Sequence, residues 1–364
     1  MAGSEMSAAM STGVPKTMLA YRMLEWQQPP QMVEVDVPAV GPGQVLVEVA
    51  GNGLCHSDLG MMEMPGEIAA MIGWQMPFTL GHEIGGTIAA IGPGVTGFET
   101  GEAVALISPA SCGTCSLCVR GHDSACPNGM AGRGYGRDGG LAHYVVANAP
   151  RDVISLGTLD PRIAAPMTDA GATSYHAVRK VLHKLIPGSS AVVLGAGGLG
   201  SFAIQLIRVM SAATVIAVDN NPNRLAYATE LGAHHTVSGI DESTPEELKR
   251  ITNNEGATVV LDFVSIDASV EVGVGAVQPY GTYGIIGSNT GTLKRPWFGS
   301  LPRDGEIITF QGSSNSDGRD VVKLAEQGLI RSDADLFAFD KVAEAYDALH
   351  HGTLRGRAVV TPNA

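Results

Sequence analysis

A glycine-rich turn between an apolar run and a helical segment constrains the fold of this 364-residue chain more than any other feature. The run Ala191–Leu194 has strand length, the six residues Gly195–Gly200 read G-A-G-G-L-G, and Leu199–Met210 has helical spacing. A further apolar run, Thr214–Val218, ends in Asp219. That is close to the spacing of about 20 residues that dinucleotide-binding units place between the glycines and an acidic residue. The order strand, glycine turn, helix, strand, acid predicts a parallel sheet that binds a dinucleotide.

Each part of this turn has a physical role in binding a cofactor. Glycines let the backbone approach a pyrophosphate, and the N-terminus of the following helix favours its negative charge. The Asp219 carboxylate can accept hydrogen bonds from both ribose hydroxyls and would repel a 2′-phosphate, which favours NAD over NADP. Alternatively, the glycines only permit tight helix–sheet packing, and Asp219 is an ordinary turn residue. The candidate cofactor-binding residues here are Gly195, Gly197, Gly198, Leu199, Gly200, Asp219 and Arg224.

The alternation of strands and helices continues after this turn but is absent from the first half of the chain. Helical spacing at Asn223–Leu231 is followed by strand-like runs at Thr258–Phe263 and Gly281–Ile286, as in a doubly wound parallel sheet. Before about Asp169 the chain reads instead as short strands separated by glycines. From Ile307 onward it reads as a strand, two helices and a last strand. We therefore expect an α/β chain with a Rossmann sheet and a second, β-rich domain.

Charge and hydropathy exclude several kinds of partner. The formal net charge is −13, whereas nucleic acids and anionic membranes favour basic surfaces. Two long uncharged stretches, Leu185–Ile207 and Val272–Leu293, are interrupted by glycines, which indicates buried strands and turns and no membrane span. Met1–Pro15 lacks a secretory pattern and reads as a loose N-terminal extension. We expect a cytoplasmic protein whose partner is a small molecule, with no nucleic acid and no membrane.

Four of the five cysteines form one cluster with the spacing C-x2-C-x2-C-x7-C. In a reducing compartment, clustered cysteines bind metal more often than they form disulfides. Four thiolates suit a closed tetrahedral zinc site that leaves no position for water, so this zinc should be structural. The alternatives are an iron–sulfur cluster or two disulfides. The cluster consists of Cys112, Cys115, Cys118 and Cys126.

The fifth cysteine and a histidine suggest a second metal site that is open. Cys55 lies in G-N-G-L-C-H-S-D and His82 lies in L-G-H-E-I-G-G. One thiolate and one imidazole are two ligands of a catalytic zinc. Each residue alone is a weak signal, because a buried cysteine is usually a small apolar residue and a single histidine is usually structural. Together, beside a nicotinamide site, they are a stronger signal.

These motifs together resemble the zinc-containing medium-chain alcohol dehydrogenases, in particular the bacterial secondary-alcohol dehydrogenases. The resemblance runs from Thr17 to Val360. It rests on Cys55-His56-Ser57-Asp58, on Gly81-His82-Glu83 followed by Gly86, Gly92 and Val95, on the four-cysteine cluster and on the glycine turn. It implies a GroES-like catalytic domain over 1–170 with the structural zinc lobe at 108–128. An NAD-binding Rossmann domain would follow over 171–307, and the catalytic domain would resume over 308–364.

The family also implies a third ligand for the open zinc site, just before the cofactor domain. The cysteine cluster leaves no second thiolate, and the residue at that position is Asp169. The resemblance implies that Asp169 replaces a cysteine, which keeps the ligand charge but supplies a harder donor. Alternatively, Asp169 caps the helix that follows. Glu83 is expected near the metal and to bind it only transiently. Two zinc ions per chain follow, one catalytic and one structural.

The resemblance assigns roles to further residues of a hydride-transfer mechanism. Zinc held by three ligands leaves a fourth position for water or the substrate oxygen. Ser57 is expected to take the alcohol proton, and His56 to contact the pyrophosphate or to serve the proton relay. Asp58 would fix the tautomer of His82, and Arg355 would pair with the cofactor phosphates. The alternatives for His56 and Arg355 are plain surface residues.

The predicted activity is reversible hydride transfer between an alcohol and NAD, giving a ketone or aldehyde. A secondary or bulky apolar alcohol is expected. A polyol dehydrogenase, a zinc-free quinone or enoyl reductase, and a non-enzymatic NAD-binding protein are the alternatives. The family also implies a homodimer or homotetramer. The residues considered for the substrate pocket, each of which could equally be ordinary core, are Met61, Met62, Met64, Ile68, Trp74, Trp297 and Phe298.

Overall fold

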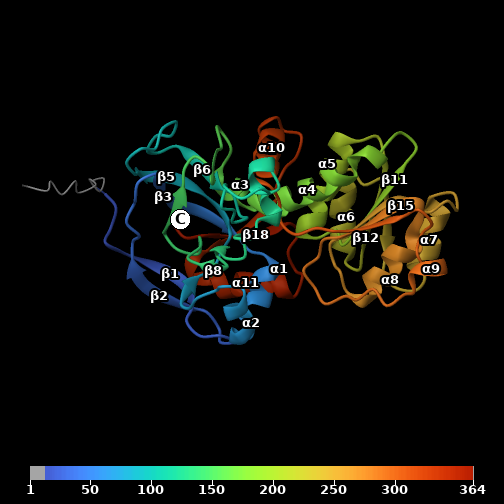
Figure 1. The fold of residues 1–364 in the computed structure, drawn as a ribbon, viewed down its shortest axis with the longest axis horizontal. Helices are drawn as coiled ribbons and strands as arrows, with labels where there is room; N and C mark the ends of the chain where they lie inside the picture. The colour runs from blue at the N-terminus through green and yellow to red at the C-terminus, as the bar shows by residue number, and fades with distance from the viewer. Residues whose placement is uncertain (1–12, 364) are drawn as a thin grey trace, which may run out of the picture. The chain divides into compact units, whose positions relative to one another are not determined.

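The computed structural model describes residues 13–363, which form two compact units. Unit 1 contains the residues up to Asp169, Ser314–Glu326, and the chain from Ser332 onward. Unit 2 contains Ala170–Ser313 and Gln327–Arg331. Most of the N-terminal extension expected over Met1–Pro15 lies outside the described residues. Figure 1 shows that unit 1 contains both the blue-to-green first half of the chain and its red last segment.

Unit 1 is built mainly on one large sheet whose central strand is β3 (Gln44–Gly53). β3 pairs antiparallel with β5 (Glu83–Ile91) along most of its length. Near its end it also pairs with β18 (Arg357–Thr361), which arrives from the far end of the chain. The strand order is β10-β6-β5-β3-β18-β17, with β9 also on β3. The remaining strands are β6 (Ala103–Leu106), β9 (Tyr144–Asn148), β10 (Val153–Ser155) and β17 (Ala334–Ala338).

Smaller elements complete unit 1 around this sheet. β1 (Thr17–Met23) lies between β2 (Gln31–Asp36) and β4 (Phe78–Thr79) in a separate three-stranded sheet. The other elements of the unit are α1 (His56–Met62), α2 (Gly66–Met71), β7 (Gly132–Arg133), β8 (Gly136–Arg137), α3 (Pro161–Ala164), α10 (Asn315–Glu326) and α11 (Val342–His350), together with 3-10 turns at Cys118–Arg120, Asp123–Ala125, Ala165–Thr168 and Phe339–Lys341.

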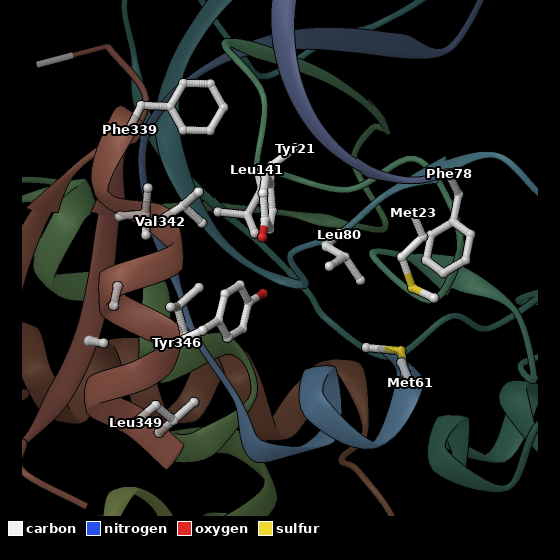
Figure 2. Packing of buried hydrophobic residues seen from close by; sticks show 14 of the residues in the cluster. Tyr21, Met23, Met61, Phe78, Leu80, Leu141, Phe339, Val342, Tyr346 and Leu349 are labelled. Atoms are coloured by element: carbon white, nitrogen blue, oxygen red, sulfur yellow. The ribbon is translucent and has the colours of Figure 1, made fainter. Parts of the chain in front are cut away.

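A hydrophobic cluster joins the first strands, α1 and the returning helix α11 (Figure 2). Tyr21 of β1 stacks on Tyr346 of α11, with ring centroids 6.2 Å apart and planes 26° apart. Met61 and Trp74 belong to this cluster, and Met62 and Met64 pack against it. For these four residues the structure shows the alternative of ordinary core packing, and a role in the substrate pocket stays a prediction. Ile68 is 48% exposed.

Unit 2 is a six-stranded parallel sheet with the order β13-β12-β11-β14-β15-β16. Numbered within the unit, this is the order 3-2-1-4-5-6 of a dinucleotide-binding doubly wound sheet. Its strands are β11 (Ser190–Leu194), β12 (Thr214–Asp219), β13 (His235–Ser238), β14 (Ala257–Asp262), β15 (Val277–Ile285) and β16 (Glu306–Thr309). Its helices are α4 (Ala170–Val181), α5 (Gly198–Met210), α6 (Pro222–Glu230), α7 (Thr244–Ile251), α8 (Asp267–Ala276) and α9 (Trp297–Ser300), with a 3-10 turn at Leu182–Lys184. The predicted fold class is confirmed.

The two long uncharged stretches contain helices as well as the expected strands and turns. Leu185–Ile207 contains β11, the glycine turn and most of α5, and Val272–Leu293 contains the end of α8 and β15. Over the described residues, no helix is long and apolar enough to cross a membrane. Trp297 and Phe298 are 76% and 81% exposed, so neither belongs to the core of unit 2.

Candidate metal centre and dinucleotide turn

Four potential metal ligands of unit 1 converge on one point. Cys55, His82, Glu83 and Asp169 each offer a ligand atom, and these atoms all lie within 4.8 Å of one another. Asp169 Oδ2 is 3.9 Å from Cys55 Sγ and 3.6 Å from His82 Nε2. Cys55 follows β3 and precedes α1, while Asp169 directly precedes α4. The fold thus brings together residues that are far apart in the sequence.

Asp58 contacts two members of this cluster, Cys55 and His82. It lies in the first turn of α1 and is fully buried. Its Oδ2 accepts a hydrogen bond from the backbone N–H of Cys55 at 3.0 Å, and its Oδ1 is 3.1 Å from Nδ1 of His82. Although burial lowers the pKa of His82, the Asp58 and Asp169 carboxylates raise it well above its usual value. Nδ1 faces Asp58, so Nε2 is the ring nitrogen that faces the cluster.

Glu83 has a buried partner that the sequence did not suggest. Its Oε1 pairs with Nη2 of Arg357, which also donates to the Leu54 carbonyl at 2.8 Å. Glu83 is fully buried and Arg357 is 4% exposed. Burial raises the pKa of Glu83 to about 7, although Arg357 lowers it. Arg357 comes from β18, and no local motif marks it in the sequence.

The donor set of this cluster fits a zinc ion. Cysteine sulfur, histidine nitrogen and aspartate oxygen are the ligand types that zinc takes, and catalytic sites use three of them. The buried Oε2 of Glu83 has no hydrogen-bond partner among the described residues. Three carboxylates, of Asp58, Glu83 and Asp169, gather here beside a thiol. A cation would relieve the cost of burying that negative charge.

The second cluster gathers the four predicted cysteines in one small lobe. Their sulfur atoms all lie within 4.8 Å, with Cys112 and Cys118 at 4.0 Å and Cys115 and Cys126 also at 4.0 Å. Sulfurs at the corners of a tetrahedron with zinc–sulfur bonds of about 2.3 Å would lie about 3.8 Å apart. All five cysteines are free, so the structure contains no disulfide in this lobe, in contrast to that alternative.

Backbone hydrogen bonds reach three of these sulfurs. The backbone N–H groups of Cys115, Cys118 and Cys112 donate to Cys112 Sγ at 3.3 Å, to Cys115 Sγ at 3.4 Å and to Cys126 Sγ at 3.4 Å. Donors from Thr114 and Cys115 lower the pKa of Cys112 to about 5, whereas burial raises the pKa of Cys118 to about 12. A bound cation would allow all four cysteines to ionise together.

In unit 2 the glycine turn lies between β11 and α5, as the sequence predicted. Gly195 has φ +86°, a conformation that favours glycine, and a Cβ at Gly200 would overlap the Gly195 carbonyl. Asp219, at the end of β12, accepts backbone hydrogen bonds from Ala196 and Asn221, both at 2.8 Å. These bonds tie the glycine turn to the neighbouring strand and cap the turn after β12, so the alternative structural role is present, and the cofactor role stays a prediction.

The other predicted site residues vary in exposure. Arg224 Nη1 lies 3.9 Å from Asp219 Oδ2, beside the glycine turn. His56 is exposed and Ser57 half-buried, both in the first turn of α1, and Arg355 is exposed just before β18.

Comparisons with known proteins show the family of this chain. Residues 41–157 match the alcohol dehydrogenase GroES-like domain, and residues 198–327 match the zinc-binding dehydrogenase family. An NAD-dependent alcohol dehydrogenase of Sulfolobus acidocaldarius is 32% identical over 349 residues, covering 94% of this chain and 99% of that protein. The crystal structure of the alcohol dehydrogenase of Aeropyrum pernix has a TM-score of 0.87 at 33% identity, covering 94% of this chain and all of that one. An acetophenone reductase of Geotrichum candidum, solved with NAD, has a TM-score of 0.83 at 27% identity, covering 96% of this chain and 98% of that one.

The chain belongs to the zinc-containing medium-chain alcohol dehydrogenase family. It is an enzyme of that class, an oxidoreductase that couples alcohol oxidation to NAD reduction. The predicted family, fold class and enzyme class are therefore confirmed, and the alternative of a non-enzymatic NAD-binding protein is not supported.

Proposed function

We propose that Cys55, His82 and Asp169 hold a catalytic zinc ion. The observation that carries this proposal is the convergence of one thiol, one imidazole and one carboxylate within 4.8 Å, with Asp58 behind the imidazole. When bound, zinc would acidify an alcohol and polarise a carbonyl group. Glu83, held by Arg357, is near enough to act as a transient fourth ligand.

The neighbouring residues of unit 1 supply proton transfer and cofactor contacts in this proposal. The Ser57 hydroxyl, which is half-buried and two residues after Cys55, takes the alcohol proton in this proposal. The side chains of His56 and Arg355 are exposed, and in this proposal they contact the cofactor phosphates. His56 could instead extend the proton relay.

In unit 2, we propose that the glycine turn and the N-terminus of α5 bind the NAD pyrophosphate. Asp219 accepts hydrogen bonds from the adenosine ribose, and Arg224 lies beside it. A second zinc ion, bound by the four-cysteine lobe, has a structural role because four thiolates leave no open position.

The substrate we propose is a secondary or bulky apolar alcohol and its ketone. This part rests on the sequence resemblance alone. A polyol dehydrogenase is the alternative. Turnover of matched primary, secondary, cyclic, aromatic and polyhydroxy alcohols with NAD and with NADP distinguishes them. A homodimer or homotetramer and a cytoplasmic location stay predictions.

Replacing Asp169 tests the proposed catalytic zinc directly. We expect Asp169→Ala to lose one of two zinc ions per chain, measured by metal analysis, and to lose at least 100-fold in kcat/KM, since outer partners of a metal site alone are worth about 10–100-fold. The matched control is Asp169→Cys, which supplies the thiolate of a Cys2His site and should keep two zinc ions. Two zinc ions and full turnover in Asp169→Ala would remove Asp169 from the site.

A further inference from the structure

A tyrosine of the returning helix α11 contacts the carboxylate that supports the metal cluster. The Tyr346 hydroxyl donates a hydrogen bond to Asp58 Oδ2 at 3.1 Å. Tyr346 is 6% exposed and comes 288 residues after Asp58 in the chain. Figure 2 shows its hydroxyl directed away from α11, into the cluster of buried residues. No local sequence motif marks this residue.

The hydrogen bonds of Asp58 explain why this contact matters. Oδ2 accepts from the Cys55 N–H and from the Tyr346 hydroxyl, while Oδ1 faces Nδ1 of His82 at 3.1 Å. Asp58 is fully buried, so its charge depends on these protein donors rather than on bulk water. One carboxylate therefore positions the segments of two ligands, Cys55 and His82, and Tyr346 is its third support.

Tyr346 is itself held firmly. Its ring stacks on Tyr21 and packs among the buried residues of the hydrophobic cluster. Burial raises the pKa of Tyr346 well above its usual value, so its hydroxyl stays protonated and acts as a donor. The ring thus provides packing, and the oxygen provides a fixed hydrogen bond to Asp58.

We propose that Tyr346 is a positioning residue of the catalytic metal site, which acts through Asp58 to fix the ligands His82 and Cys55. The inference rests on the proposed catalytic zinc and adds an outer layer to it. Outer partners of metal ligands orient the ligands and tune the metal. Without the Tyr346 hydroxyl, Asp58 loses one of its hydrogen-bond donors. Its carboxylate is then held less firmly against the His82 ring and the Cys55 backbone.

The test removes one oxygen atom and leaves the ring. In Tyr346→Phe we expect affinity for Co²⁺ at the catalytic site to fall about tenfold, the low end of the effect of outer partners. We also expect the visible absorption bands of the cobalt-loaded site to shift. The matched control is Tyr21→Phe, which removes a hydroxyl from the stacked ring in the same cluster. Its metal affinity and spectrum should match the unchanged protein.

A double-mutant cycle with Asp58→Asn separates positioning from general destabilisation. If Tyr346 acts through Asp58, Tyr346→Phe should have little further effect on cobalt affinity in the Asp58→Asn background. Unchanged affinity and spectrum in Tyr346→Phe, or fully additive effects in the cycle, would overturn the proposal. The proposed zinc site would still stand in either case, because it is tested by the metal content of the Asp169 variants.

Discussion

Gly53 shows how a single residue makes space for the metal cluster. It ends β3 and lies opposite Glu83 in the pairing of β3 with β5. A Cβ at Gly53 would overlap Glu83 Oε2 and come within 3.0 Å of Glu83 Cβ. Because Arg357 holds the other carboxylate oxygen, Glu83 has little freedom to move aside. The missing side chain of Gly53 is therefore what admits the Glu83 carboxylate.

Substituting this glycine should be costly, whereas a nearby glycine should tolerate the same change. We expect Gly53→Ala to lower the free energy of unfolding by about 1–3 kcal/mol, as overpacking does in cores. Gly60→Ala is the control. Gly60 lies in the exposed part of α1 with nothing near its Cβ, and the change should stabilise by about 0.5–1 kcal/mol. Urea unfolding measures both, and equal effects of the two changes would contradict this account.

At the scale of elements, the four-cysteine lobe is tied to the start of α10. Asp123, between the third and fourth cysteines, pairs with Arg151 and accepts a hydrogen bond from the Asn315 N–H at 3.1 Å. The Ser314 hydroxyl donates to the Gly121 carbonyl at 2.8 Å. The lobe therefore provides hydrogen-bond partners for a helix that lies nearly 200 residues later in the chain.

We expect removal of the proposed structural zinc to loosen this helix start. In Cys126→Ser we expect faster amide hydrogen exchange over residues 112–126 and also over the first turn of α10, because the acceptors in the lobe lose their fixed positions. Exchange in α11 serves as the internal reference and should not change. Faster exchange in the lobe alone would show that the contacts with α10 do not depend on the metal.

The elements that the sequence predicted best are those with a strong local pattern. The turn after Leu194 and the strand ending in Asp219 combine apolar runs with glycines, and the structure places both as expected. β13 and α7 were not predicted, because β13 is mostly exposed and lacks a clear apolar alternation. In the site, the ligand motifs are local, whereas Arg357 and Tyr346 reach it by pairing across the chain, which no single stretch encodes.

At the scale of the whole molecule, the two units carry different candidate sites. The proposed metal ligands all belong to unit 1, and the glycine turn with Asp219 belongs to unit 2. Each unit has its own buried core. Metal and dinucleotide should therefore stabilise different parts of the chain.

A preference for NAD over NADP should appear as a larger stabilisation of unit 2 against unfolding by NAD than by NADP. NAD at 100 times its dissociation constant should raise the unfolding free energy of this unit by about 2.7 kcal/mol, and NADP at the same concentration by less. Asp219→Asn keeps one of the two oxygens that accept from the Ala196 and Asn221 amides, and it removes the charge that repels a 2′-phosphate. We expect this variant to narrow the difference between the two cofactors in thermal shift or hydrogen exchange. An unchanged difference would assign cofactor choice to other residues.

The return of the chain to unit 1 after residue 331 has a consequence for how the enzyme is made. The ribosome releases all of the proposed zinc ligands well before it releases α11 and β18, which supply Tyr346 and Arg357. A nascent chain that has passed Asp169 therefore carries the ligands and Asp58 without the contacts that Tyr346 and Arg357 provide. Firm metal loading of the catalytic site should wait until translation has delivered the last strand, so that occupancy of this site reports a fully synthesised enzyme.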